Sequence, residues 1–307
     1  MMTKILKLGL FIVCTLSMVG CAIMTESKKP LTYPESLPTL GYTFNYNPVK
    51  ETKSVEAVFA LINPTYKGLN YGDISFKISE KSLEQTFKND EEVRQICDDY
   101  LNAIKSDFNE TLIAKGYSLL GPFSSLNEMT YGEKEKSILS LIPTLNLRFQ
   151  FVDNTGAENV EIFSNTSKII TRSQGNRTVL SKKTQMVAKY TGNLIVDGFI
   201  ELVLVEPLTG EKMWIKQIKV PFENESYYYY AFLEYLQDVD IIGNPIGNLF
   251  ITNSYLLKQN DFRPRALAKA LEKVYITQLE SFDKYFDPKE ISLVIRDAEK
   301  VRKLKRY

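Results

Sequence analysis

Residues 194–220 read LIVDGFIELVLVEPLTGEKMWIKQIKV, and this stretch carries the clearest signal for the fold. Residues 194–205 are rich in β-branched and aromatic side chains, and residues 213–220 return with further apolar positions. The segment 206–210 between them, EPLTG, contains a proline and a glycine, which are typical turn residues. Two such runs joined by a short turn predict an antiparallel β-hairpin.

Outward from this hairpin, two stretches show the spacing of amphipathic helices. In residues 91–115 apolar side chains recur every three or four positions, and Gly116 lies where a helix C-cap belongs. In residues 263–286 the same spacing begins at an Arg-Pro pair, and Asp287–Pro288 ends the pattern. Each of these stretches predicts one long helix with a single apolar face.

Shorter segments complete the expected architecture. Residues 55–62 and 138–152 read as strands, the tyrosine-rich residues 223–237 as a further packed helix, and residues 241–262 as a loop. Hairpins mixed with two long amphipathic helices predict the α+β class. We therefore expect a mostly antiparallel meander or hairpin sheet with the two long helices packed on it.

The sequence also predicts a division of the chain into four parts. No linker-like stretch divides residues 44–286, which we expect to form one α+β domain. Residues 21–43 contain three prolines and few periodic apolar positions, and they read as a lipid-anchored tether. Residues 287–307 read as a basic amphipathic C-terminal tail, and residues 1–20 as a lipoprotein signal peptide.

The signal peptide is predicted from charge and length. Lys4 and Lys7 precede an apolar stretch that is shorter than the roughly 20 residues needed to span a bilayer. The stretch ends in Leu-Ser-Met-Val-Gly-Cys at residues 16–21, which is similar to the bacterial lipobox. In a lipobox the cysteine receives a diacylglyceryl group and a further acyl chain such as palmitate, so Cys21 is expected to be acylated. The alternatives are an ordinary signal peptide with an incidental cysteine, or an uncleaved anchor.

The position after the lipobox bears on the membrane. Ala22 follows Cys21, whereas an aspartate there resembles an inner-membrane retention signal. The sequence therefore favours anchoring in the cell outer membrane.

Composition excludes several classes of function. The chain has 307 residues and no histidine, which removes histidine-based acid/base catalysis, Ser-His-Asp and Cys-His nucleophile systems, and zinc sites that need imidazole. Its 38 basic and 37 acidic residues lack the basic excess of nucleic-acid binders. Three cysteines are too few for a disulfide scaffold, and Cys97 is predicted to be a buried core residue. We expect no enzymatic activity, no cofactor, no metal site and no nucleic-acid partner.

One basic segment is a candidate binding site. Residues 176–183 read NRTVLSKK, and arginine pairs bidentately with carboxylates while lysine adds a point charge. Such a segment can hold the carboxylate of a sialic acid, through Arg177, Lys182 and Lys183. The alternative is a solvated loop or a strand edge on which lysine discourages unwanted pairing.

Several motifs together resemble one known family. They are the lipobox ending Gly20–Cys21, Asn45-Tyr46-Asn47-Pro48, the strand end 61–66, Lys115-Gly116-Tyr117, the strand 145–149, and the hairpin 198–210 with its EPLTG turn. Over about residues 20–285 the chain resembles the neuraminyllactose-binding haemagglutinin family, which comprises bacterial outer-membrane lipoproteins that act as adhesins or lie in the flagellar sheath. The family's proposed sialic-acid motif is Lys-Arg-Thr-Ile-Gln-Lys-Lys. The segment here is similar in its Arg-Thr-aliphatic and Lys-Lys parts, but it has Asn176 for the first lysine and one extra residue before Lys182.

The resemblance implies a function in cell adhesion and virulence. The chain is expected to be a non-enzymatic outer-membrane lipoprotein of a Gram-negative bacterium, with adhesin-like binding of sialylated host glycans or of envelope components. Its partners are then outer-membrane lipid, through acylated Cys21, and a glycan or envelope protein. The alternative is a structural or assembly lipoprotein that acts through protein–protein contacts without binding a glycan.

Overall fold

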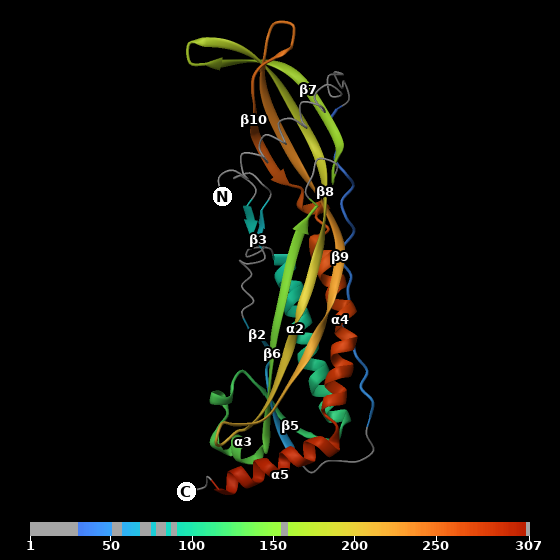
Figure 1. The fold of residues 1–307 in the computed structure, drawn as a ribbon, viewed down its shortest axis with the longest axis vertical. Coiled ribbons are helices and arrows are strands. Elements are labelled where there is room, and N and C mark those ends of the chain that lie inside the picture. The colour runs from blue at the N-terminus through green and yellow to red at the C-terminus, as the bar shows by residue number, and fades with distance from the viewer. Residues whose placement is uncertain are drawn as a thin grey trace.

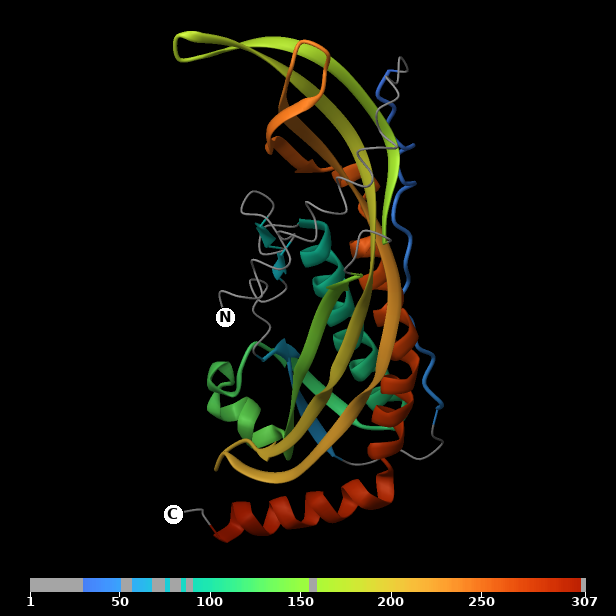
Figure 2. The same ribbon diagram turned by 45° about the horizontal axis from the view of Figure 1, so that its top comes forward.

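The computed structural model describes residues 30–50, 57–67, 75–77, 84–86, 91–154 and 159–304. Within them lies an elongated molecule built around one long, curved sheet (Figures 1 and 2). Cys21 and the predicted signal peptide lie outside the described residues. The predicted division into signal, tether, domain and tail stays a prediction.

A hairpin of two very long strands runs through the whole molecule. It consists of β8, Arg177–Glu206, and β9, Glu211–Val239, which pair antiparallel from Glu206–Glu211 to Ser181–Asp238. The hairpin predicted at residues 194–220 is confirmed, and it forms the lower half of this longer one. Alternating inward apolar residues explain its stability, because one face of each strand is buried on the core.

The sheet changes partners halfway along β8. The lower half of β8 pairs with β6, Leu139–Asp153, and the upper half pairs with β7, Val160–Gln174. On the other side of the hairpin, β10, Pro245–Leu256, pairs with the upper part of β9. The sheet therefore has a lower part that continues through β6 and an upper part that ends at β7 and β10.

The remaining strands are short. β1, Val58–Ile62, lies between β6 and β5, Ser118–Phe123, and β2, Thr65–Tyr66, pairs with β6. A separate two-stranded hairpin consists of β3, Ser75–Lys77, and β4, Glu84–Thr86.

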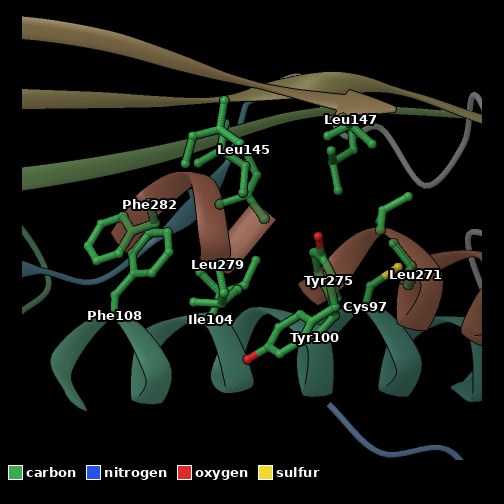
Figure 3. Packing of buried hydrophobic residues seen from close by; sticks show 14 of the residues in the cluster. Cys97, Tyr100, Ile104, Phe108, Leu145, Leu147, Leu271, Tyr275, Leu279 and Phe282 are labelled. Carbon is green, nitrogen blue, oxygen red and sulfur yellow. The ribbon is translucent and has the colours of Figure 1, made fainter. Parts of the chain in front are cut away.

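Two long helices pack on the lower part of the sheet. They are α2, Glu91–Ala114, and α4, Arg263–Tyr285, at the positions where the apolar periodicity predicts helices. Figure 3 shows their apolar faces meeting, with the rings of Phe108 and Phe282 stacked at a centroid distance of 3.7 Å. Complete burial of such a side chain contributes about 1.5–3 kcal/mol to stability. Cys97 is fully buried here, as predicted.

Two shorter helices complete the lower end of the molecule. α3, Tyr131–Lys136, begins with a capping box between Thr130 and Glu133, and α5, Pro288–Leu304, crosses below the sheet (Figure 1). Ile291 and Ala298 of α5 are buried. Single-turn helices at Leu126–Glu128 and Lys258–Asn260 lie in connecting segments.

The predicted fold class, a mostly antiparallel meander or hairpin sheet with two long helices packed on it, is wrong. The sheet is mixed, since β1 runs parallel to both β5 and β6, and β2 also runs parallel to β6. It is also strongly curved, and its upper part extends beyond the helices (Figure 2). Strand direction depends on long crossover connections, which local apolar patterns do not record.

Two local predictions are also wrong. The tyrosine-rich residues 223–237 form the upper part of β9, not a helix, and residues 245–256 of the predicted loop form β10. Tyrosine favours strands, and in this segment buried and less buried rings alternate: Tyr227 and Tyr229 are buried, whereas their neighbour Tyr228 is half-buried. Because residues 227–230 are all tyrosine, the sequence does not show the alternation that is typical of a strand.

The curvature has a local cause at Gly198. A register shift interrupts the pairing of β8 with β9 between Val196 and Gly198, as a β-bulge does. Gly198 has φ +137°, and a Cβ atom there would clash with the carbonyl oxygen of Asn146 on β6. Only glycine permits this close approach of the two backbones.

Candidate binding surface

The upper part of the sheet forms an arm that none of the described helices covers (Figure 2). We define the upper arm as residues 160–189 and 231–256, which comprise β7, β10 and the upper ends of β8 and β9 (Figures 1 and 2). Its small core consists of Met186, Ala188, Leu233 and Tyr235. Because little else packs on this sheet, many of its side chains are exposed to solvent.

Exposed apolar side chains are frequent on the upper arm. The members of this set share at least partial access to solvent on an uncovered sheet or turn: Ile162, Phe163, Ile169, Ile241, Ile242, Ile246, Leu249, Phe250, Ile251 and Tyr255. A concentration of exposed apolar side chains in one region of a protein is typical of contact surfaces. The upper arm is therefore the strongest candidate for binding.

The turn between β9 and β10 is the most exposed part of this surface. Ile241 and Ile242 are 92% and 82% exposed, and Ile246 is 65% exposed. Asp240 holds the turn, because its carboxylate accepts hydrogen bonds from the backbone N–H groups of Ile242 and Asn244 at 2.9 and 2.8 Å. Hydrogen bonds from Asn244 lower the pKa of Asp240 below its ordinary value, so this carboxylate stays ionised.

The upper arm also carries a run of positive charge. Residues 162–196 contain six basic residues and no acidic ones: Lys168, Arg172, Arg177, Lys182, Lys183 and Lys189. Three of the six have carboxylate partners, in the pairs Arg172–Asp238 at 2.6 Å, Lys183–Glu234 at 2.7 Å and Lys189–Glu161 at 3.3 Å. Among the described residues, Lys168, Arg177 and Lys182 make no ion pair.

The structure does not bring the three predicted glycan-binding residues together. Arg177 is exposed at the end of the β7–β8 hairpin, opposite Gln174. Lys182 and Lys183 are neighbours on β8 and point to opposite faces of the sheet. Lys183 shares a face with Arg177 but lies six residues away, about 20 Å along the strand.

Sequence reasoning missed a polar cluster at the lower end of the upper arm. There the arm joins the body, which is the lower part of the sheet with the helices α2 and α4 packed on it. The hydroxyl groups of Tyr227 and Tyr229 donate to the two oxygens of Asp153 at 2.7 and 3.0 Å. Arg263 donates bidentately to Asp261 and lies with its guanidinium carbon 4.8 Å from the centre of the Tyr229 ring. The hydrogen bonds to Asp153 and the contact of Arg263 with the Tyr229 ring tie β6, β9 and the start of α4 together, so the cluster acts as a structural joint.

Burial governs the electrostatics of this cluster. It raises the pKa of Asp153 above its ordinary value, although the hydrogen bonds from Tyr227 and Tyr229 oppose the shift. Burial and the neighbouring carboxylate also raise the pKa values of both tyrosines. The only sequence signal was that Asp153 follows a strand, which predicts a turn and not a contact with residues more than seventy positions away.

The described part of the chain holds no group of three or more His, Cys, Asp or Glu side chains suited to a metal ion. Burial raises the pKa of the Cys97 thiol to about 12, so this cysteine is not a nucleophile at neutral pH. No helix among the described residues has the length and apolarity required to cross a membrane.

The chain is similar in structure to solved proteins, although its sequence has diverged from theirs. No protein-family model matches the chain, and no curated protein is similar to it. Among solved structures, it is similar to a neuraminyllactose-binding hemagglutinin homolog from Helicobacter pylori, with 13% sequence identity and a TM-score of 0.46. The match covers 85% of this chain and 100% of the other. Two chains at this level of similarity can differ in ligand and activity.

Proposed function

We propose that this chain is an outer-membrane lipoprotein that is anchored through acylated Cys21 and acts by binding, not by catalysis. The lipobox-like residues 16–21 and the preceding signal-peptide layout support the anchor. Two or more acyl chains on one cysteine give a stable attachment to a bilayer. Binding is supported by the uncovered upper arm, which is the single observation that carries this part of the proposal.

The upper arm suits a ligand with both apolar and anionic groups. Its exposed apolar residues lie beside Lys168, Arg177 and Lys182, the three cations without carboxylate partners among the described residues. The predicted sialylated glycan is one such ligand, since Arg177 can pair with a sialic-acid carboxylate. An envelope component fits the surface better. Lys183 is already paired with Glu234, and Lys182 points to the other face of the sheet, so neither lysine can help Arg177 to hold the carboxylate of a small sugar acid.

A titration with sialyllactose separates these two ligands. If the glycan is the ligand, binding is expected to weaken at least tenfold in Arg177→Ala and less in Lys182→Ala. Lys219→Ala is the matched control, because Lys219 is exposed on the lower part of β9. An absence of binding that is the same in all four proteins would exclude the glycan and leave the envelope component.

The rival function is that of a structural or assembly lipoprotein with a protein partner. Exposed apolar residues on β10, such as Phe250 and Ile251, support it, since β10 is an edge strand of the sheet among the described residues. Chemical cross-linking in intact cells, compared between the natural chain and Phe250→Ser, tests it. Loss of one specific cross-linked species in the variant would favour this rival.

A further inference from the structure

We infer that the upper arm lies against the same bilayer that holds Cys21, with Ile241 and Ile242 inserted at its surface. This inference rests on the proposed lipid anchor and assigns the anionic ligand of the arm. The ligand is the phospholipid bilayer itself, contacted by the β9–β10 turn and by Lys182.

The path of the N-terminal segment is the first argument. From Tyr46, which donates to Asp283 near the end of α4, the extended chain runs beside α4 toward the upper arm (Figures 1 and 2). The backbone of Thr43 donates to Glu272, and the backbone of Leu37 donates to Gln259. At Thr32 the backbone N–H donates to the hydroxyl of Ser164 on β7, at 2.9 Å. The described chain therefore begins beside the upper arm.

The length of chain before Thr32 is the second argument. Thr32 lies eleven positions after Cys21, and eleven residue steps can span at most about 36–40 Å. Along β7, Ile169 lies five residues beyond Ser164, or about 17 Å. The β9–β10 turn is at the level of Ile169, since a Cβ atom on Gly243 would lie 3.8 Å from the Cδ1 atom of Ile169. A lipid on Cys21 can therefore enter the same bilayer as this turn.

The chemistry of the turn is the third argument. It presents two adjacent, almost fully exposed isoleucines, and burial of each contributes about 1.5–3 kcal/mol. Several of its backbone groups are already paired, because Gly243 donates to the carbonyl oxygen of Asp240 and Asp240 donates to that of Asn244, at 3.0 and 2.9 Å. This pairing lowers the cost of insertion to the depth of the headgroups, because backbone groups without a partner are the main cost of entering lipid.

Charge is the fourth argument. Lys182 and Ile169 are directly opposite on β8 and β7, so their side chains share the face over which Gly243 lies. Lys168 and Arg177 lie exposed on the other face of the same hairpin, so Lys182 is the cation that shares the face of the turn. Each cation near an anionic membrane surface adds about 1 kcal/mol of attraction. No charged residue occurs from 241 to 257, so Asp240 is the only acidic group in the turn.

Tryptophan fluorescence tests the inference directly. The chain has a single tryptophan, Trp214, on the lower part of β9, so an added reporter is read as the difference from the natural protein. The acylated Ile242→Trp protein is reconstituted into vesicles of phosphatidylethanolamine and phosphatidylglycerol that contain bromine-labelled lipid. We expect the added emission to shift to shorter wavelength and to be quenched at least twofold. Ile215→Trp is the matched control, because Ile215 is 51% exposed on the lower part of the molecule, and it should show neither change.

The possible results of this experiment test the insertion of the β9–β10 turn separately from the lipid anchor at Cys21. Flotation of the protein with the vesicles, without quenching of the Ile242→Trp reporter, overturns the inference and leaves the anchor. Failure to float overturns both. Equal quenching of the two reporters overturns the inference, because the molecule then has no preferred end at the membrane. The spectral change can instead depend on the number of protein molecules per vesicle and not on the content of bromine-labelled lipid. The turn then contacts a second copy of the protein, and this result also overturns the inference.

Discussion

The hydroxyl of Tyr227 on β9 donates a hydrogen bond to Asp153 at the end of β6, and the bond passes across Gly192 on the strand between them. All three positions are in register on one face of the sheet. A Cβ atom on Gly192 would overlap the Tyr227 ring and lie 2.6 Å from the carbonyl oxygen of Val152. The joint between body and arm thus requires a residue without a side chain at its centre.

Substitution of Gly192 by alanine should therefore destabilise the protein. Overpacking at a well-packed position costs about 1–3 kcal/mol, and displacement of Tyr227 would add the loss of its bond to the half-buried Asp153. The free energy of unfolding, measured in urea, should fall by at least 1 kcal/mol in Gly192→Ala. Gly132→Ala is the control, since nothing lies within 4 Å of a Cβ atom there. Equal stability of Gly192→Ala and the natural chain would contradict the described geometry.

A second prediction concerns the attachment of α5. Arg302 donates to the fully buried carboxylate of Glu206 and to the carbonyl oxygens of Ser137 and Glu135. In Arg302→Ala the carboxylate of Glu206 stays buried without its cation, a loss that typically costs about 3–5 kcal/mol. Urea unfolding should show a decrease of that order. Lys300→Ala should change stability by less than about 1 kcal/mol, because its pair with Asp297 is exposed.

The same ion pair predicts a pH dependence. Burial alone would raise the pKa of Glu206, but hydrogen bonds from Thr209 and Arg302 outweigh it and hold the pKa below its ordinary value. The folded state then binds the proton more weakly than the unfolded state does, so this contribution is full above the unfolded pKa of about 4.5 and is lost as the pH falls toward the lower folded pKa. Unfolding measured from pH 6 to pH 3 should show a smaller loss of stability in Glu206→Gln than in the natural chain. An identical slope in the two proteins would exclude Glu206 as a source of the acid sensitivity.

The anchor makes a separate prediction in cells. Cys21→Ala should abolish incorporation of labelled fatty acid and move the protein from the membrane fraction to the soluble fraction, because the acylated thiol is absent. Cys97→Ala is the control, since Cys97 is buried in the core and should leave labelling unchanged. Labelling that persists in Cys21→Ala would rule out acylation of this cysteine.

The parts of the fold that the sequence predicts are those with a local period. The spacing of Ile104, Phe108 and Leu112 predicts α2, and the turn at 206–210 predicts the lower hairpin. Orientation of β1 was not predictable, because its two parallel partners begin sixty and eighty residues later along the chain. The joint at Asp153 was missed for the same reason.

The candidate site shows the same limit. The charges of Arg177, Lys182 and Lys183 are evident in the sequence, but a strand places adjacent side chains on opposite faces, whereas the predicted loop left their directions open. The partners of Lys183 and Arg172, Glu234 and Asp238, come from β9, a segment predicted to be helical up to residue 237. Ile241 and Ile242 are exposed because no described helix or strand covers them, and no local pattern in the sequence records this.

The unbroken length of β8 and β9 has a mechanical consequence. These strands, of 30 and 29 residues, run from the turn beside α5 to the upper arm without an intervening linker. If the arm is held at a membrane and a pulling force acts on the opposite end, the load runs along the strands. The antiparallel hydrogen bonds lie perpendicular to that direction and would have to shear together instead of unzipping one by one. The long hairpin is therefore expected to resist extension along the axis of the molecule.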